Sequence, residues 1–387
     1  MDRTYLVECI SMTEVLKRAS WLELFYDLAY VALVAQLTYL VAQYHSTFEE
    51  VLIGLLISYM IFVGWWGTTA NRNLQDSEDT TDKLFIQLQM LIALLMSISM
   101  SAVYEGDPTR FFLLFAVIRL VQVLMMLRMY AMFPDDAPPT KNIAQGITVA
   151  VVLWCICAYL ESPLLLIVAY AALLIDIMTP LTTGEGNSLR LLNVTHMQER
   201  LGLFLILVIG ESMLVVAITS TAAQVAAIEP YIVLSGMIMM VSLWWMYFDY
   251  LERCGATQRP HFFSYLHAHA ALFIGVVLMA AGFRNVLLVA DVSSSEILFI
   301  GGGFVLCLFA LMVVRLSLLG WRPHFFGEVV VAALGVLLLI VATMSGVLQL
   351  FVSILILTTM VVFYSVLDSY LLTRHRSNLA IAQKGQK

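Results

Sequence analysis

Residues 20–44 read SWLELFYDLAYVALVAQLTYLVAQY, an apolar run long enough to cross a lipid bilayer that nevertheless contains Glu23 and Asp27. About 20 apolar residues in an α-helix span the hydrocarbon core of a bilayer. Glu23 and Asp27 are four residues apart and share one face of that helix, which Tyr30 and Val34 continue. Because a carboxylate is costly in lipid, the stretch predicts a membrane helix whose polar face lines the interior of a bundle.

The composition of the whole chain predicts a polytopic membrane protein. Of its 387 residues, 61% are hydrophobic and 12% are charged, whereas an average soluble domain has roughly a quarter charged residues. The apolar runs are continuous and do not alternate with polar residues, which excludes a transmembrane β-barrel. We therefore predict an all-α polytopic membrane protein with about 12 transmembrane helices. The expected spans are 21–44, 51–69, 84–104, 110–132, 143–160, 162–180, 197–221, 230–250, 264–285, 295–316, 327–345 and 348–372.

The basic residues predict the orientation of these spans. With 12 spans, 17 of the 20 Lys and Arg fall on the side that holds both chain ends, while Arg110 and Arg284 fall on the other side and Arg119 lies within a span. Basic residues concentrate in cytoplasmic loops, so we predict that the N and C termini are cytoplasmic. The first 19 residues lack the apolar core of a cleavable signal peptide, and we expect the first span itself to direct insertion.

The two halves of the chain resemble each other. Glu199 follows Glu23 by 176 residues, the Trp244-Trp245 pair follows Trp65-Trp66 by 179, and His267 follows Gln87 by 180. A slowly drifting offset favours an internal duplication into two parallel six-helix repeats. Spans of equal length also produce such similarities by chance, and that alternative stays open. The predicted organisation is a cytoplasmic segment 1–20, a first repeat 21–180, a cytoplasmic linker 181–196, a second repeat 197–372 and a cytoplasmic tail 373–387.

Ionisable residues within the spans concentrate in the predicted cytoplasmic half of the membrane. Each charge at the centre of a membrane helix costs about 2.5–3.5 kcal/mol, so these groups must be paired, protonated or hydrated. The pattern favours a polar chamber that opens toward the cytoplasm and ends at a layer formed by Arg119 and Glu211. The candidate substrate-binding, ion-binding or proton-relay residues are Glu23, Asp27, Arg119, Asp176, His196, Glu199, Arg200, Glu211, Trp245, Asp249, His267 and His269.

Several candidates have a purely structural alternative. Glu23 also suits the N-terminus of its helix, where the helix dipole favours negative charge. Asp27 close to a second carboxylate is typical of a proton or cation site. Arg119 and Glu211 form either a structural salt bridge or a gate that opens when a solute or proton arrives.

The positions of the histidines and tryptophans limit the kinds of site that the sequence can form. His267 and His269 point in nearly opposite directions on a helix, which disfavours a shared metal ion. A site built from Glu23, Asp27, His196 and Glu199 is the one arrangement that suits a metal, but no repeated histidine motif supports it, and we predict no metal or other cofactor. The two tryptophan pairs, 65–66 and 244–245, are typical of anchors at the membrane interface. No phosphate-binding loop, nucleophile motif or nucleic-acid-binding patch is present.

Two motifs resemble those of a known family. Glu23-Leu-Phe-Tyr-Asp27-Leu, and His196-Met-Gln-Glu199-Arg200-Leu-Gly-Leu-Phe followed by Ile-Gly-Glu211-Ser212, resemble the bacterial low temperature requirement protein A family, named for a cold-growth phenotype. The Trp244–Asp249 and His267–Gly282 stretches are similar to it as well, although Leu201 stands where the family usually has an aromatic residue. The resemblance covers nearly the whole chain and implies a multi-pass protein of the bacterial plasma (inner) membrane. It implies no particular substrate or reaction.

These observations favour a secondary transporter or permeation protein, with proton coupling as an option. Its expected partners are the lipid bilayer and a small solute, ion or lipid ligand, and nucleic acid is not expected. Whether the protein forms a homo-oligomer is an open alternative. A membrane-embedded enzyme that uses the same acids and histidines on a lipid or isoprenoid is the alternative from another class. A ligand-binding membrane sensor is the third hypothesis.

Overall fold

The computed structural model describes residues 19–74, 79–132, 138–181, 192–222, 230–254, 261–288, 293–319 and 323–384. Within these ranges the chain forms twelve α-helices and one short 3-10 helix, and no strand. The helices are α2 (Trp21–Gln43), α3 (Phe48–Asn73), α4 (Thr80–Tyr104), α5 (Thr109–Met132), α6 (Pro138–Cys157), α7 (Leu164–Met178), η1 (Thr179–Leu181), α9 (Val194–Ala222), α10 (Pro230–Cys254), α11 (Phe262–Leu288), α12 (Glu296–Leu319), α13 (Pro323–Met344) and α14 (Leu350–Lys384).

Eleven of these helices are long and apolar enough to cross a membrane. The prediction of an all-α, multi-pass membrane protein is therefore confirmed. In α13 the apolar part, Val329–Met344, is shorter than a full span. The expected segment 327–345 includes Glu328 near its start, which shortens the uninterrupted apolar stretch.

The first three helices begin at side chains that cap them. Ser20 and Glu23 form a reciprocal capping box at the start of α2, and Thr47 and Glu50 form another at the start of α3. Asp79 accepts a hydrogen bond from the backbone N–H of Asp82 before α4. Such caps satisfy backbone N–H groups that have no partner within the helix.

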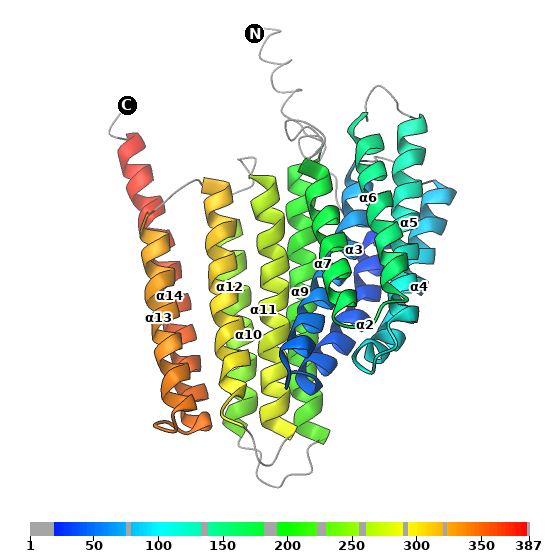
Figure 1. The fold of residues 1–387 in the computed structure, drawn as a ribbon. Coiled ribbons are helices and arrows are strands. Elements are labelled where there is room, and N and C mark those ends of the chain that lie inside the picture. The colour runs from blue at the N-terminus through cyan, green and yellow to red at the C-terminus, as the bar shows by residue number, and fades with distance from the viewer. Residues whose placement is uncertain are drawn as a thin grey trace, which may run out of the picture.

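The helices pack side by side in a bundle, with α2–α7 toward one side and α10–α14 toward the other (Figure 1). Helix α9 packs against α2 and α3 of the first half and against α10 and α11 of the second. Helix α11 also packs against α2 and α3. Helices α2, α3, α9 and α11 therefore form the interface between the two halves.

The two halves share most of their helix pairs. In the first half α2 packs on α3 and α4, and α3 packs on α7; in the second, α9 packs on α10 and α11, and α10 packs on α14. Consecutive pairs from α4 to α7 have counterparts from α11 to α14. The pattern agrees with the predicted duplication, which stays a prediction together with the membrane side of the termini. Residues 1–18, 182–191 and 385–387 of the predicted terminal and linker segments lie outside the described residues.

Candidate functional site

Asp27 lies in a buried ion pair between the two halves of the bundle. Its carboxylate accepts two hydrogen bonds from the guanidinium of Arg200 in α9, at 2.6 and 2.7 Å. Trp65 of α3 donates a third hydrogen bond from Nε1, at 2.7 Å. All three side chains are buried. A buried carboxylate with a bidentate arginine partner has the compensation that its burial requires.

Glu23 also contacts α9, one helical turn before Asp27. Its carboxylate lies 3.5 Å from Nε2 of His196, which is fully buried. On the other side of the ring, Nδ1 of His196 lies 3.1 Å from the side-chain nitrogen of Asn73 in α3. Asn73 in turn hydrogen-bonds the backbone N–H and C=O of Asn193. The acidic face of α2 therefore joins the first half to the beginning of α9.

Glu199 does not join this group. It is exposed, whereas His196 and Arg200 on the same helix are buried. His196 and Arg200 are four residues apart and point toward α2, while Glu199 is rotated by about 100° from Arg200 on the helix. The four residues Glu23, Asp27, His196 and Glu199 are therefore not brought together. In the described part of the chain, no three His, Cys, Asp or Glu side chains gather as ligands for a metal would.

Arg119 forms the second buried ion pair, with Asp176. Nη2 of Arg119 lies 2.8 Å from the carboxylate of Asp176, and Trp154 donates to the other carboxylate oxygen at 3.1 Å. Nη1 donates to the carbonyl of Val63 at 3.4 Å and to the side chain of Gln122. Nε of Arg119 is buried and has no hydrogen-bond partner among the described residues.

The expected layer of Arg119 and Glu211 is therefore wrong. Helix α5, which carries Arg119, packs on α3, α4 and α6, while Glu211 belongs to α9 in the other half. Glu211 is buried, and it makes no hydrogen bond or ion pair within the described part of the chain. The predicted similar depth of the two residues does not determine which helices are neighbours.

A chain of neutral polar groups holds Gln122 in place beside Arg119. Nε2 of Gln122 donates to the carbonyl of Gly64 at 2.7 Å and to Oγ1 of Thr68 at 3.0 Å. Thr68 donates to Gln89 of α4 at 2.6 Å. These bonds satisfy buried polar atoms on α3, α4 and α5 and leave Arg119 in a defined orientation.

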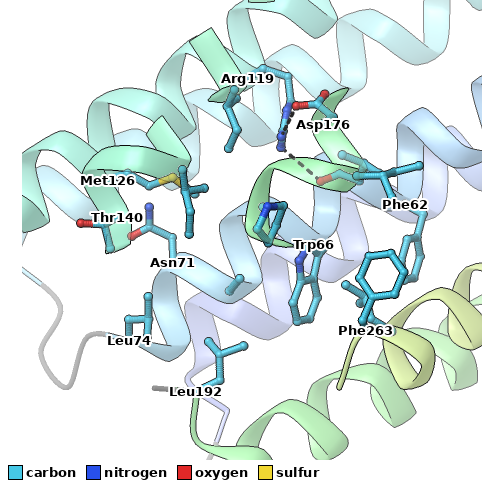
Figure 2. Close-up of a pocket in the computed structure, with 18 of the residues that line it drawn as sticks. Phe62, Trp66, Asn71, Leu74, Arg119, Met126, Thr140, Asp176, Leu192 and Phe263 are labelled. Carbon is cyan, nitrogen blue, oxygen red and sulfur yellow. Dashed lines mark hydrogen bonds and ion pairs between the residues drawn. The ribbon is translucent and has the colours of Figure 1, made fainter. Parts of the chain in front are cut away.

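A cavity of about 90 Å³ ends at this ion pair. We call it the first cavity. Figure 2 shows Arg119 and Asp176 at one end, Trp66, Phe62 and Phe263 on one wall, and Asn71 and Thr140 on another. Apolar side chains make up most of the lining. The full set of lining residues is Phe62, Val63, Trp66, Gly67, Ala70, Asn71, Leu74, Arg119, Met126, Thr140, Ile143, Ile147, Asp176, Ile177, Pro180, Leu192, Phe263, Leu266 and His267.

The two histidines of α11 contact different helices. His267 lines the first cavity, and its Nδ1 hydrogen-bonds the hydroxyl of Tyr59 in α3. His269 is buried, and its Nε2 lies 2.8 Å from the hydroxyl of Tyr247 in α10.

The tryptophan pairs also differ from each other. Trp244 and Trp245 are exposed, and half-buried Asp249 lies one turn further along α10. Trp65 is instead fully buried on Asp27, and Trp66 lines the first cavity. The interpretation of residues 65–66 as interfacial anchors is therefore wrong, because their helix lies at the interface between the halves.

A further buried ion pair was not predicted from the sequence. Arg315 of α12 donates to both carboxylate oxygens of Asp368 in α14, at 2.5 and 2.6 Å. Arg315 also donates to the carbonyl of Met246 in α10, at 3.4 Å. Arg315 is one of the 17 basic residues assigned to the cytoplasmic side, yet Arg315 and Asp368 both lie inside expected spans, 295–316 and 348–372, and that position was the available signal.

The Arg315–Asp368 pair parallels the Arg119–Asp176 pair. In each half an arginine of the fourth helix binds an aspartate of the sixth and a carbonyl of the second. Only the pair of the first half borders the first cavity. Comparison of the two pairs therefore distinguishes what such an ion pair does for stability from what the Arg119–Asp176 pair does at the first cavity.

Comparison with known proteins agrees with this architecture. An uncharacterized protein of Rhizobium meliloti (strain 1021) is 22% identical over 289 residues, which cover 68% of this chain and 68% of that protein. The sequence model of the family described as bacterial low temperature requirement A protein (LtrA) matches residues 18–365. That match includes every helix from α2 to α13, the Asp27–Arg200 and Arg119–Asp176 ion pairs, and Arg315, whereas Asp368 lies beyond it. The chain is a bacterial multi-pass membrane protein and belongs to the LtrA family.

Proposed function

We propose that this protein is a proton-coupled carrier of small amphipathic organic anions, which bind at Arg119 in the first cavity. The observation that carries the proposal is the position of the Arg119–Asp176 ion pair at the end of an otherwise apolar cavity. A solute with an apolar body and one anionic group matches both features of this lining. With the predicted orientation, the cavity lies in the cytoplasmic half of the bacterial plasma membrane.

Asp176 occupies the position at Arg119 that the anion of a solute would take. Arginine stays protonated in proteins, so Arg119 requires an anionic partner at all times. When a solute carboxylate replaces Asp176, the aspartate loses its compensating charge in a buried environment. Uptake of one proton by Asp176 removes that cost. One anion and one proton then bind together, and the cavity keeps its net charge.

Proton uptake has few candidate sites in this cavity. Besides Arg119 and Asp176, His267 is the titratable side chain that lines it. The groups that hold the ion pair in place from α3, α5 and α6 are the neutral side chains of Gln122 and Trp154 and the carbonyl of Val63. A substitution of His267 by Gln therefore separates its contribution from that of Asp176.

The size of the cavity supports a small solute. Its volume of about 90 Å³ exceeds the ~10–15 Å³ that one water molecule requires. A macromolecular ligand does not suit a space enclosed by α3, α5, α6, α7 and α11.

The enzyme alternative receives less support. Acid–base chemistry requires the acid and the base to reach the substrate. Among the acids and histidines that the sequence suggested, Asp176 and His267 line the first cavity, and Asp176 is paired with Arg119. The buried Glu23 and His196 do not line it. Both instead connect helices of the two halves.

Equilibrium binding tests the proposal. We expect radiolabelled benzoate to bind the purified wild-type protein in detergent, and we expect the uncharged benzyl alcohol and the cationic benzylammonium not to compete. Because binding takes up a proton, the affinity rises by up to about tenfold for each unit by which the pH falls. The His267→Gln variant should keep this dependence.

Matched variants locate the site. Asp176→Asn frees Arg119, so benzoate should bind it more tightly and independently of pH. The double variant Arg119→Gln/Asp176→Asn removes both charges without leaving either unpaired, and it should not bind benzoate. Retention of binding by the double variant, or weaker binding by Asp176→Asn, contradicts the proposal.

A further inference from the structure

A second cavity lies between α3 and α11, which also line the first cavity, on the opposite side of the bundle. Its volume is about 160 Å³. Helix α3 lines it with residues from Glu50 to Ser58, and α11 lines it with residues from Ile274 to Leu278. The first cavity is lined by later residues of α3, from Phe62 to Asn71, and by earlier residues of α11. Because α3 and α11 run in opposite directions, the two cavities follow one seam toward opposite membrane faces.

The distance between the cavities along the seam is short. Ser58 borders the second cavity and Phe62 borders the first, and four residues of helix correspond to about 6 Å. On α11 the corresponding residues are His267 and Ile274, which are about 10 Å apart along the helix axis.

Tyr59 and His267 occupy this interval. The Tyr59 hydroxyl hydrogen-bonds Nδ1 of His267, and the two rings stack with their centroids 6.1 Å apart. Phe263 lies against the His267 ring, at 4.1 Å between centroids. Beyond His267, α11 presents Ala270 and Ala271 before it reaches Ile274, so the aromatic rings supply the bulk at this level.

The ion pairs across the interface lie nearer its two ends. On the predicted cytoplasmic side these are the Asp27–Arg200 and Glu23–His196 pairs. On the opposite side His45 lies 3.4 Å from Glu296 of α12. The Tyr59–His267 pair is a single hydrogen bond between two side chains, and Nε2 of His267 is buried without a hydrogen-bond partner among the described residues. Rotation of either ring therefore disrupts fewer interactions than separation of the ion pairs.

We propose that the seam between α3 and α11 is the path along which the solute passes between the two cavities, with Tyr59 and His267 as its closed constriction. This inference rests on the proposed transport function, because it supplies the route from the anion site at Arg119 to the other membrane face. Truncation of either constriction residue should join the cavities while the ion pairs at the interface stay intact.

Cysteine accessibility tests the path without a known solute. In a background that lacks the five native cysteines, Ser58→Cys reports on the second cavity and Ala70→Cys on the first. The probe is the membrane-impermeant anion 2-sulfonatoethyl methanethiosulfonate, applied to sealed right-side-out or inside-out vesicles. We expect each cysteine to react from one face only, and from opposite faces.

The constriction variants should change this result. With Tyr59→Ala or His267→Ala added, Ser58→Cys should also react from the face that reaches Ala70→Cys, at least about tenfold faster than before. Tyr370→Ala, which truncates an exposed tyrosine of α14, is the matched control and should change nothing. Two independent truncations keep the test decisive if one of them fails to fold.

Failure of the path and failure of the proposed function give different results. If Ser58→Cys stays accessible from one face, or reacts from neither, in both truncated variants, the path is wrong even when benzoate binds at Arg119. If the reagent crosses but benzoate does not bind, the path stands and the choice of solute is wrong.

Discussion

The guanidinium of Arg200 in α9 donates two hydrogen bonds to the carboxylate of Asp27 in α2, across a sequence separation of 173 residues. This ion pair explains why an apolar membrane helix carries an aspartate on its buried face. The neighbouring Glu23 contacts His196 of the same helix α9 and also caps α2. The two carboxylates therefore connect the halves of the bundle, and the proposed anion site is formed by other residues.

Loss of the Asp27 charge should destabilise the protein strongly. Asp27→Asn leaves the guanidinium of Arg200 buried without a counter-charge, so we expect the free energy of unfolding to fall by about 3–5 kcal/mol. The double variant Asp27→Leu/Arg200→Met removes both charges and should recover much of that loss. Unfolding in mixed micelles measures both effects. Equal stability of Asp27→Asn and wild type would show that the pair is not needed.

The fold follows from sequence patterns because apolar runs of membrane length require helices. The burial of Asp27 and Arg119 also follows from their depth within such runs. The ion-pair partners of these two residues do not follow from the sequence. Arg119 binds Asp176 rather than Glu211 because the packing of α5 brings it next to the helices of its own half, and single-sequence periodicity carries no information on helix neighbours. For the same reason, the sequence does not identify Asp27 as the partner of Arg200 or Asp368 as the partner of Arg315.

Gly67 should tolerate no side chain. A Cβ atom there would lie 2.3 Å from Oε1 of Gln122 and 2.6 Å from Nη1 of Arg119. We expect Gly67→Ala to displace both groups and to lower the free energy of unfolding by about 1–3 kcal/mol. Gly210→Ala is the control, because no atom lies within 4 Å of its added Cβ, and the better helix propensity should raise stability by up to about 1 kcal/mol. Thermal unfolding of both variants checks the contrast; similar effects would exclude close packing at Gly67.

Neutralisation of Glu211 should not harm the protein. Its carboxylate is buried without a hydrogen bond or ion pair among the described residues, and an uncompensated charge in such an environment is unfavourable. We expect Glu211→Gln to raise the free energy of unfolding by about 1 kcal/mol and to leave benzoate affinity unchanged. The measurement is the same pair of unfolding and binding assays. A loss of binding in a folded Glu211→Gln protein would assign Glu211 to the site.

The two parallel ion pairs should respond differently to the same substitution. Asp368→Asn removes the carboxylate that compensates the buried charge of Arg315, away from the first cavity. We therefore expect a loss of about 3–5 kcal/mol in the free energy of unfolding, without a change in the pH dependence of benzoate binding. Asp176→Asn should abolish that pH dependence. Binding isotherms over a pH series distinguish the variants. Identical pH profiles of the two variants would contradict the assignment of proton uptake to Asp176.

The coupling of anion and proton at the Arg119–Asp176 pair is tested most directly by counting the protons that bind with benzoate. Isothermal titration calorimetry in two buffers of different ionisation enthalpy gives this number. We predict uptake of about one proton per benzoate by wild type at neutral pH and about none by Asp176→Asn. Benzoate binding to wild type without proton uptake would contradict the account, because Asp176 would then stay charged after its displacement from Arg119.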